Sequence, residues 1–384
     1  MTKIYIKRVL KITFLIAAIV ISSILLQFTV LRDISHSSIR VYGFYQEPQN
    51  TLDVVLVGAS EVYTGYNAPM AYDKYGFTSY PYAVAGNRTF AWKTMLEEIQ
   101  RTQKPELIVI EMNCMAYRKK PYKDLAVSHY IVDGIPDIEE KSKAIERMAC
   151  EDDIAYYFPL TKYKNKIFEK KGVSVNTSLL DIKLRGYSLL KGNFGMTGVY
   201  PTEGNILDVS KNDKREELNP EFEKGLIDFL EYCKDNDIKN VMFYENPHRI
   251  TDVNGFETNV PYLNRAEDII KSYGFDVARF DKINFEEMKI DPDRDFYNDG
   301  HLNYRGQQKF TDYFAGYLVK HYDIKPAELS DKDRQRWEES AEYTKLYYEY
   351  AEELTEKNEK EPLYEKKPVM DKLKEMRNTS KAKN

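Results

Sequence analysis

The chain is poor in the residues that build disulfide frameworks and metal-binding motifs. Its three cysteines, Cys114, Cys150 and Cys233, are widely spaced and odd in number. Such a set favours buried thiols over a disulfide scaffold or a cysteine-based metal centre. The sequence also contains no HExxH segment, no EF-hand loop and no glycine-rich nucleotide loop. We therefore expect no metal and no other cofactor.

Long runs of basic residues are also missing. Lys and Arg total 56, Asp and Glu total 61, and the formal net charge is −5. Without a basic stripe, little in the sequence would attract a phosphate backbone, so nucleic acid is not an expected partner. What is present is a hydrophobic fraction of 42%, which is enough for a sizeable core in one large or two ordinary domains.

One long apolar run lies near the N-terminus. Residues 12–31 carry no charge, and at about 1.5 Å per residue they match a hydrocarbon core of about 30 Å. Four basic residues between positions 3 and 11 precede the run, so the positive-inside rule places the N-terminus in the cytoplasm. A cleaved signal peptide is the alternative, but the run exceeds the usual core of about 7–15 residues and no A-x-A site follows. We expect residues 1–35 to be a cytoplasmic stub and single transmembrane anchor of an extracytoplasmic protein.

The following part of the chain alternates between strand and helix patterns. This rhythm predicts a doubly wound, mainly parallel α/β sheet in three layers, spanning residues 50–325, with its ligand site at the carboxyl ends of the strands. The expected strands are 53–58, 80–85, 106–111, 241–244 and 277–280, and the expected helices are 89–102, 220–233, 262–273 and 302–322.

Two stretches do not follow this rhythm. Residues 115–205 are charged and aromatic, and we expect a mostly helical insertion that is either a lid over the site or a packing embellishment. Residues 326–384 are highly charged, which predicts a helix to about residue 353 followed by a disordered tail.

A serine and a histidine are the residues most suited to chemistry. Ser60 directly follows the first predicted strand, where a tight turn would expose its hydroxyl at the edge of the sheet; a helix N-cap is the structural alternative. A serine nucleophile needs a nearby base. Among the five histidines, His301 lies in a polar, carboxylate-rich loop before the last predicted helix. His248 follows another strand, and we assign it a substrate-contact or structural role.

Together, the strand ending in Gly58-Ala-Ser60 and the later Asp299-Gly-His301-Leu-Asn-x-x-Gly segment resemble the SGNH, or GDSL-like, hydrolase family. The resemblance covers about residues 50–322 and implies that Ser60 is the nucleophile and His301 its base. It also implies three oxyanion donors: the backbone of Ser60, the backbone of Gly86 and the side chain of Asn113. The sequence departs from the family pattern in having Gly-Ala-Ser for Gly-Asp-Ser and in lacking Gly-x-Asn-Asp around Asn113.

The acid of the expected triad is less clear from the sequence. The family usually has Asp three residues before the histidine, but this position is Asn298. Asp299 is the expected acid because it is nearest, and its spacing resembles that of extracytoplasmic proteins that acetylate polysaccharides. Asp295 is the alternative, and a bare Ser–His dyad would have a less well oriented imidazole.

The anchor and the SGNH-like core resemble proteins of teichoic acid D-alanylation and polysaccharide O-acetylation. This resemblance implies a serine esterase or O-acyltransferase acting on an envelope glycan or acylated polymer, with a multispanning membrane O-acyltransferase as a partner. Transferase and esterase share an acyl-enzyme step and differ in whether a sugar hydroxyl or water removes the acyl group. The alternative from another class is a non-catalytic carbohydrate-binding or assembly protein on a degenerate scaffold.

Overall fold

The computed structural model describes residues 2–29, 35–158, 182, 184–357, 359, 362–363 and 365–381. Its centre is a five-stranded parallel sheet in the order β2-β1-β3-β5-β6. The strands are β1 Val54–Gly58, β2 Ser79–Ala83, β3 Leu107–Glu111, β5 Val241–Glu245 and β6 Asp276–Arg279. Every residue of the first four is buried, as expected for strands covered on both faces. The predicted doubly wound, mainly parallel sheet is confirmed.

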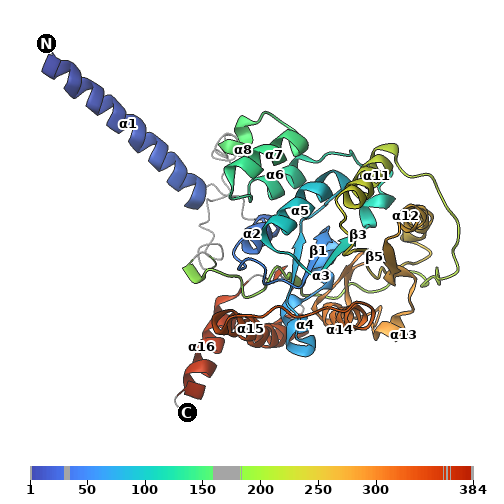
Figure 1. The fold of residues 1–384 in the computed structure, drawn as a ribbon. Coiled ribbons are helices and arrows are strands. Elements are labelled where there is room, and N and C mark those ends of the chain that lie inside the picture. The colour runs from blue at the N-terminus through green and yellow to red at the C-terminus, as the bar shows by residue number, and fades with distance from the viewer. Residues whose placement is uncertain are drawn as a thin grey trace.

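Helices cover both faces of this sheet (Figure 1). One layer contains α2 His36–Phe44, α5 Thr89–Thr102, α11 Pro220–Asp235 and α12 Val260–Ser272. The other contains α3 Ser60–Gly65, α4 Ala68–Tyr75, α14 Tyr304–His321 and α15 Asp331–Glu356. Aromatic rings tie the layers to the sheet: Trp92 of α5 meets Phe243 of β5 at 6.1 Å between centroids, and Phe314 of α14 stacks on Tyr244 at 4.9 Å.

The strand order fixes where a site can form. Counting the sheet strands along the chain gives the order 2-1-3-4-5, in which the connections leave β1 and β3 toward opposite faces of the sheet. Crevices at the carboxyl ends of the strands open at this switch point. Ser60 follows β1 and Asn113 follows β3, where it begins the 3-10 helix η1 Asn113–Ala116.

The region predicted as an insertion contains three described helices, α6 Leu125–Val132, α7 Ile138–Met148 and α8 Ile154–Tyr157. Helix α6 packs on α2 and α5, so these helices thicken one layer of the sandwich. Residues 159–181, which belong to the same predicted region, lie outside the described residues. A short strand, β4 Gly195–Met196, pairs antiparallel with β9 Pro362–Leu363.

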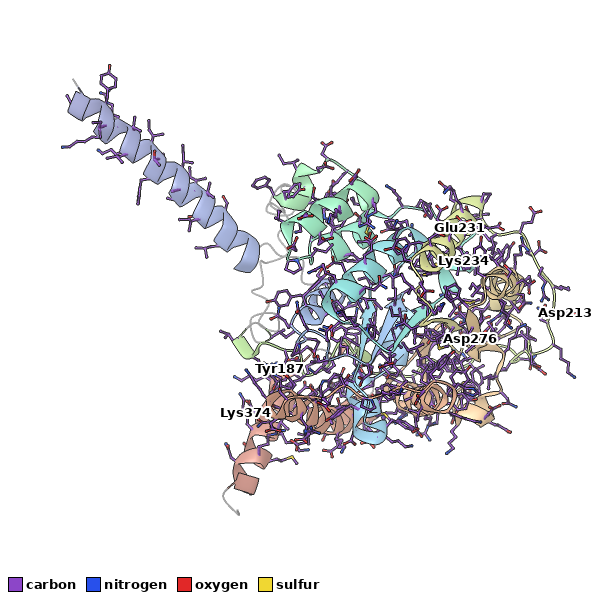
Figure 2. All side chains as sticks on the ribbon, in the orientation of Figure 1. Tyr187, Asp213, Glu231, Lys234, Asp276 and Lys374 are labelled. Atoms are coloured by element: carbon purple, nitrogen blue, oxygen red, sulfur yellow. The ribbon has the colours of Figure 1, made fainter. Side chains whose placement is uncertain are left out.

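The C-terminal segment contains the expected helix, and a second helix follows where a disordered tail was expected. Helix α15 extends to Glu356, and a further helix, α16 Lys367–Lys381, follows. Trp337 of α15 is 1% exposed and lies 5.1 Å from Tyr72 of α4 between ring centroids. Tyr187 lies beside α15 (Figure 2), and its hydroxyl donates a hydrogen bond to Glu339 at 2.6 Å. The charged composition of this segment did not indicate that aromatic residues on one face of α15 are buried.

The remaining elements are short, apart from the N-terminal helix. They are α13 Phe285–Met288, η2 Phe256–Thr258, η3 Phe280–Lys282, and a hairpin of β7 Phe296–Asn298 and β8 His301–Leu302. Helix α1, Thr2–Thr29, lies apart from the α/β body (Figure 1). Within the described residues, none of the helices meets the length and apolarity required of a membrane span.

Candidate active site

The turn after β1 presents Ser60 at the carboxyl edge of the sheet. Gly58 is required there because a Cβ at this position would lie 2.5 Å from both Glu111 Cβ and Val62 Cγ2. The close approach lets Glu111 Oε2 accept a hydrogen bond from the backbone N–H of Ala59 at 3.0 Å. The carboxyl end of β3 thus braces the turn that carries the serine.

Ser60 and His301 are brought together across 241 residues of sequence. Ser60 Oγ lies 2.7 Å from His301 Nε2, within ordinary hydrogen-bond range. His301 begins β8 of the short hairpin that precedes α14. Asn303 caps this helix by accepting hydrogen bonds from the N–H groups of Arg305 and Gly306, which fixes the hairpin against the helix.

Asn298 is the partner of the other ring nitrogen of His301. Its Oδ1 lies 2.9 Å from His301 Nδ1 and also accepts the backbone N–H of Gly300 at 3.0 Å. A backbone N–H can only donate, so the atom it meets must be the amide oxygen. Because that oxygen can only accept, His301 Nδ1 carries the proton and Nε2 offers its lone pair to Ser60. This is the tautomer that a general base requires.

The two carboxylates expected to orient His301 are placed elsewhere. Asp299 Oδ1 accepts hydrogen bonds from Nε and Nη2 of the fully buried Arg249 at 2.9 and 2.7 Å. Asp295 Oδ2 meets Lys309 Nζ at 2.5 Å and accepts the backbone N–H of Asp291. The prediction of Asp299 as the orienting acid is corrected: in an antiparallel hairpin Asn298 is the residue opposite His301, and Asp299 turns away from His301 to the buried Arg249.

The residues expected to bind an oxyanion line the same cleft as Ser60 and His301. This cleft has a volume of about 680 Å³ and is bordered by Gly86 and Asn113 as well. Gly86 has φ +71°, a left-handed conformation that favours glycine. Asn113 donates one amide N–H to Glu61 Oε1 at 2.6 Å. The opposite N–H of that amide is the one that could meet an oxyanion.

Electrostatics keep the imidazole of His301 neutral. Burial lowers its pKa below the usual value, the nearby Glu61 raises it, and His248 lowers it again. Glu61 itself is buried, which would raise its pKa, but the ion pair with His248 holds the pKa below its usual range. His301 is therefore in its basic form at neutral pH.

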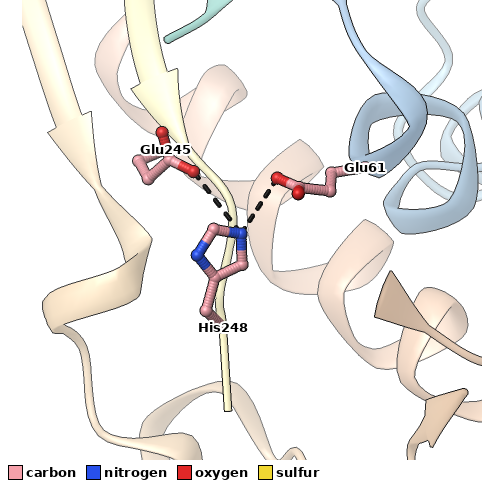
Figure 3. A group of neighbouring side chains, drawn as sticks. All are labelled: Glu61, Glu245 and His248. Carbon is pink, nitrogen blue, oxygen red and sulfur yellow. Dashed lines mark hydrogen bonds and ion pairs between the residues drawn. The ribbon is translucent and has the colours of Figure 1, made fainter. Parts of the chain in front are cut away.

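A second group of side chains lies beside Ser60, and the sequence predictions named only one of its members, His248. It comprises Glu61 from α3, Glu245 from the end of β5 and His248 from the loop that follows (Figure 3). His248 Nε2 lies 2.9 Å from Glu61 Oε2 and 3.5 Å from Glu245 Oε1. We expected a substrate-contact or structural role for His248. The missed signal is that both Glu111 and Glu245 end buried apolar strands at the edge where ligands bind.

Similarity to known proteins is found among solved structures. No family model and no curated protein matches the chain. Among solved structures, the lipase/acylhydrolase from Enterococcus faecalis matches with 10% identity and a TM-score of 0.30, covering 72% of this chain and 100% of that one. A putative GDSL-like lipase from Parabacteroides merdae matches with 10% identity and a TM-score of 0.30, covering 73% and 99%. Scores this low support no inference about activity.

Proposed function

We propose that this protein is a serine-dependent esterase or O-acyltransferase that forms an acyl-enzyme on Ser60. The observation that carries the proposal is the relay in which Asn298 orients His301 and His301 Nε2 meets Ser60 Oγ at 2.7 Å. A serine and a histidine can form such a contact for structural reasons alone. Here the pair borders a large cleft at the switch point of the sheet, where a substrate can reach it.

The chemistry follows from the geometry of the relay. His301 Nε2 takes the proton from Ser60 as Oγ attacks the acyl carbon, and the leaving alcohol takes that proton back as the ester bond breaks. The carbonyl oxygen gains negative charge in the intermediate, and N–H groups at Gly86, Asn113 and Ser60 are the donors proposed to stabilise it. An acceptor hydroxyl, from water or from a sugar, then removes the acyl group by the same proton path.

The rim of the cleft favours an anionic polymer as the substrate. Arg118, Lys119 and Lys120 are exposed and line the cleft that contains Ser60. Arg118 donates to Thr258 at 3.1 Å, and Lys120 lies 3.7 Å from the ring centroid of Tyr117, so both side chains are held at the rim. A row of fixed positive charges attracts phosphate or carboxylate groups. A teichoic-acid-like polymer with acylated hydroxyl groups fits this surface.

We further propose that the enzyme works outside the cell membrane, attached by α1. Apolar side chains on this helix are exposed, among them Phe14 at 76% and Leu10 at 62%, and their burial in lipid would be favourable. The positive-inside rule then orients the catalytic body outward. In this setting a multispanning O-acyltransferase is the proposed donor of acyl groups.

An active-site probe and a small ester test the catalytic proposal. The full-length protein is expected to react with a fluorophosphonate and to hydrolyse p-nitrophenyl acetate, because the nucleophile is activated before any specific substrate binds. Ser60→Ala should lose both reactions while its circular dichroism spectrum and melting temperature stay unchanged. Undiminished turnover in Ser60→Ala would refute the mechanism.

The choice of control separates catalysis from simple binding. Ser128 is also buried, but its hydroxyl bonds to Met148 and Tyr156, away from the cleft, so Ser128→Ala should keep the fluorophosphonate reaction. A wild-type protein that binds an anionic envelope polymer but never labels at Ser60 would instead be a non-catalytic binding protein. A protein that labels and transfers acetyl groups to added alcohols faster than to water would be a transferase.

A further inference from the structure

We propose that Glu61, Glu245 and His248 form a binding site for a first-row divalent cation, such as Zn²⁺ or Mn²⁺, beside the nucleophile. One ligand atom from each of the three side chains lies within 4.8 Å of the others. Two carboxylates and one imidazole are a ligand set suited to these ions. Binding is read directly as bound metal, so the proposal stands or falls independently of the esterase activity.

The three side chains direct their ligand atoms to one common point and do not form separate ion pairs. A single ring nitrogen, Nε2 of His248, faces both carboxylates, at 2.9 Å from Glu61 and 3.5 Å from Glu245 (Figure 3). A cation can replace the proton on Nε2 and lie between the three ligand atoms. The second oxygen of Glu61 is already occupied by the amide of Asn113 at 2.6 Å, which orients the carboxylate toward the cluster.

Unsatisfied oxygens are the second observation that points to an ion. The side chain of Glu245 is 0% exposed, and neither of its carboxylate oxygens has a hydrogen-bond partner within the described part of the chain. A buried carboxyl group without a hydrogen-bond partner is costly in either protonation state. Glu245 points at His248 and Glu61 (Figure 3), where a cation would satisfy it.

The cluster is bordered by a further buried carboxyl group and by an arginine that already has a carboxylate partner. Glu111 is a third buried glutamate next to Glu61, so the group contains three carboxyl groups and one imidazole. Arg279 interacts electrostatically with Glu245, but its guanidinium already forms a bidentate pair with Asp281 at 2.8 and 2.6 Å. A divalent cation would be stabilised by these carboxyl groups and would displace their protons on binding.

The cluster lies where an ion can enter from the cleft and can contact a bound substrate. Glu61 and His248 both line the cleft that contains Ser60, so the site opens toward substrate. With three protein ligands, the ion would keep a coordination position for water or for an anionic group of the substrate. It would also hold Glu61, and through it Asn113, in place.

Metal titration of the full-length chain tests this proposal. The protein is stripped with a chelator, dialysed, and titrated with Zn²⁺ and separately with Mn²⁺ by calorimetry, and bound metal is counted after desalting. Glu245→Gln and His248→Gln should each weaken ion binding at this site at least about tenfold relative to wild type. After desalting, wild type should therefore retain one more ion per chain than either variant. Ser60→Ala should bind the ion normally although it loses ester hydrolysis.

Two matched variants make the result specific. His129 is also flanked by two carboxylates, Asp133 and Glu151, but contacts them through opposite ring nitrogens, so His129→Gln should keep the wild-type stoichiometry. Glu111→Gln removes a neighbouring buried carboxyl without removing a proposed ligand and should also keep it. Equal binding by wild type and Glu245→Gln, or no ion retained by wild type with either metal, would overturn the site and leave a cluster of protonated carboxyl groups.

Discussion

At the residue scale, the site differs from an acid-containing triad in having a neutral amide behind the imidazole. Asn298 can fix the ring and its tautomer, as a carboxylate does, but it adds no negative charge to stabilise the imidazolium that forms during the reaction. Glu61 is the anionic group whose field acts on His301. In the proposed mechanism Asn298 therefore supplies the orientation, whereas Glu61 and His248 act on the charge of the ring in opposite directions.

The lowered pKa of His301 predicts the pH dependence of the reaction. Only the neutral imidazole can accept the serine proton, so kcat/KM falls as the pH drops through the pKa of His301. Since that pKa lies below its usual value of 6.5, activity should stay constant from neutral pH down to mildly acidic pH before it declines. A pH series of p-nitrophenyl acetate hydrolysis measures this limb. A midpoint above 6.5 would contradict the burial of His301.

Replacement of Asn298 tests the relay itself. Asn298→Ala removes the acceptor for His301 Nδ1, so the ring can adopt the wrong tautomer, and kcat should fall by about 10²-fold. Asn298→Asp should restore the orientation and shift the acid limb upward by about one pH unit, because a carboxylate favours the protonated ring. Asp299→Asn is the comparison variant: its carboxylate faces the buried Arg249, so the change should lower stability but keep kcat of the folded protein near that of wild type.

At the element scale, most of the sheet and its helices could be predicted from the sequence because each element has a simple pattern. The apolar runs of β1 and β3 and the spacing in α5 and α11 identified these elements, and α5 begins and ends where predicted. The helix that ends near residue 353 was also predicted, but its burial was not, because many charged residues separate Trp337 and Tyr347. Their burial depends on α4 and on the 187–191 segment, which local patterns do not reveal.

The candidate site could be predicted only in part, for a related reason. Ser60 and His301 each lie in a recognisable local segment. The choice between Asn298, Asp299 and Asp295 depends on which side of a hairpin faces the serine, and no local pattern carries that information. The convergence of Glu61, Glu245 and His248 depends on the order of strands in the sheet.

A buried ion pair joins three separate elements of the chain. Lys191 Nζ lies 2.9 and 2.8 Å from the oxygens of Glu47 after α2, and 4.6 Å from the ring of Trp337 in α15. Both charged side chains are almost fully buried. Removing one partner of such a pair leaves an uncompensated charge in the interior.

Lys191→Met should therefore lower the free energy of unfolding by about 3–5 kcal/mol. Chemical denaturation of the full-length chain measures the loss. The double variant Glu47→Gln, Lys191→Met should recover part of it, because neither charge is then left alone. If both variants were as stable as wild type, the pair would not connect these elements in solution.

At the scale of the whole molecule, α15 is part of the α/β body. Its residues Trp337 and Tyr347 are buried, and Tyr348 accepts a hydrogen bond from Asn67 at 2.8 Å. Asn67 caps α4, the helix that follows the one carrying Ser60. Helix α15 thus holds α4, which directly follows the helix that carries the candidate nucleophile.

Trp337→Ala should cost about 3–5 kcal/mol of stability, because it opens a large cavity between α15 and α4 and removes the ring beside Lys191. Thermal unfolding followed by circular dichroism measures the change. The control is Met376→Ala in α16. Met376 is 51% exposed, so its replacement opens no buried cavity and should leave the transition unchanged. Equal stability of the two variants would mean that α15 is peripheral.

The bond between Asn67 and Tyr348 joins positions 281 residues apart, and Ser60 meets His301 across 241. A ribosome releases β1 long before it releases α14 or α15, so the layer that contains these two helices is completed only when almost the whole chain has been made. Such distant pairings slow folding and leave apolar strands open to other chains. The species most prone to aggregate is therefore the nascent chain, and it is the last-made helices that end its exposure.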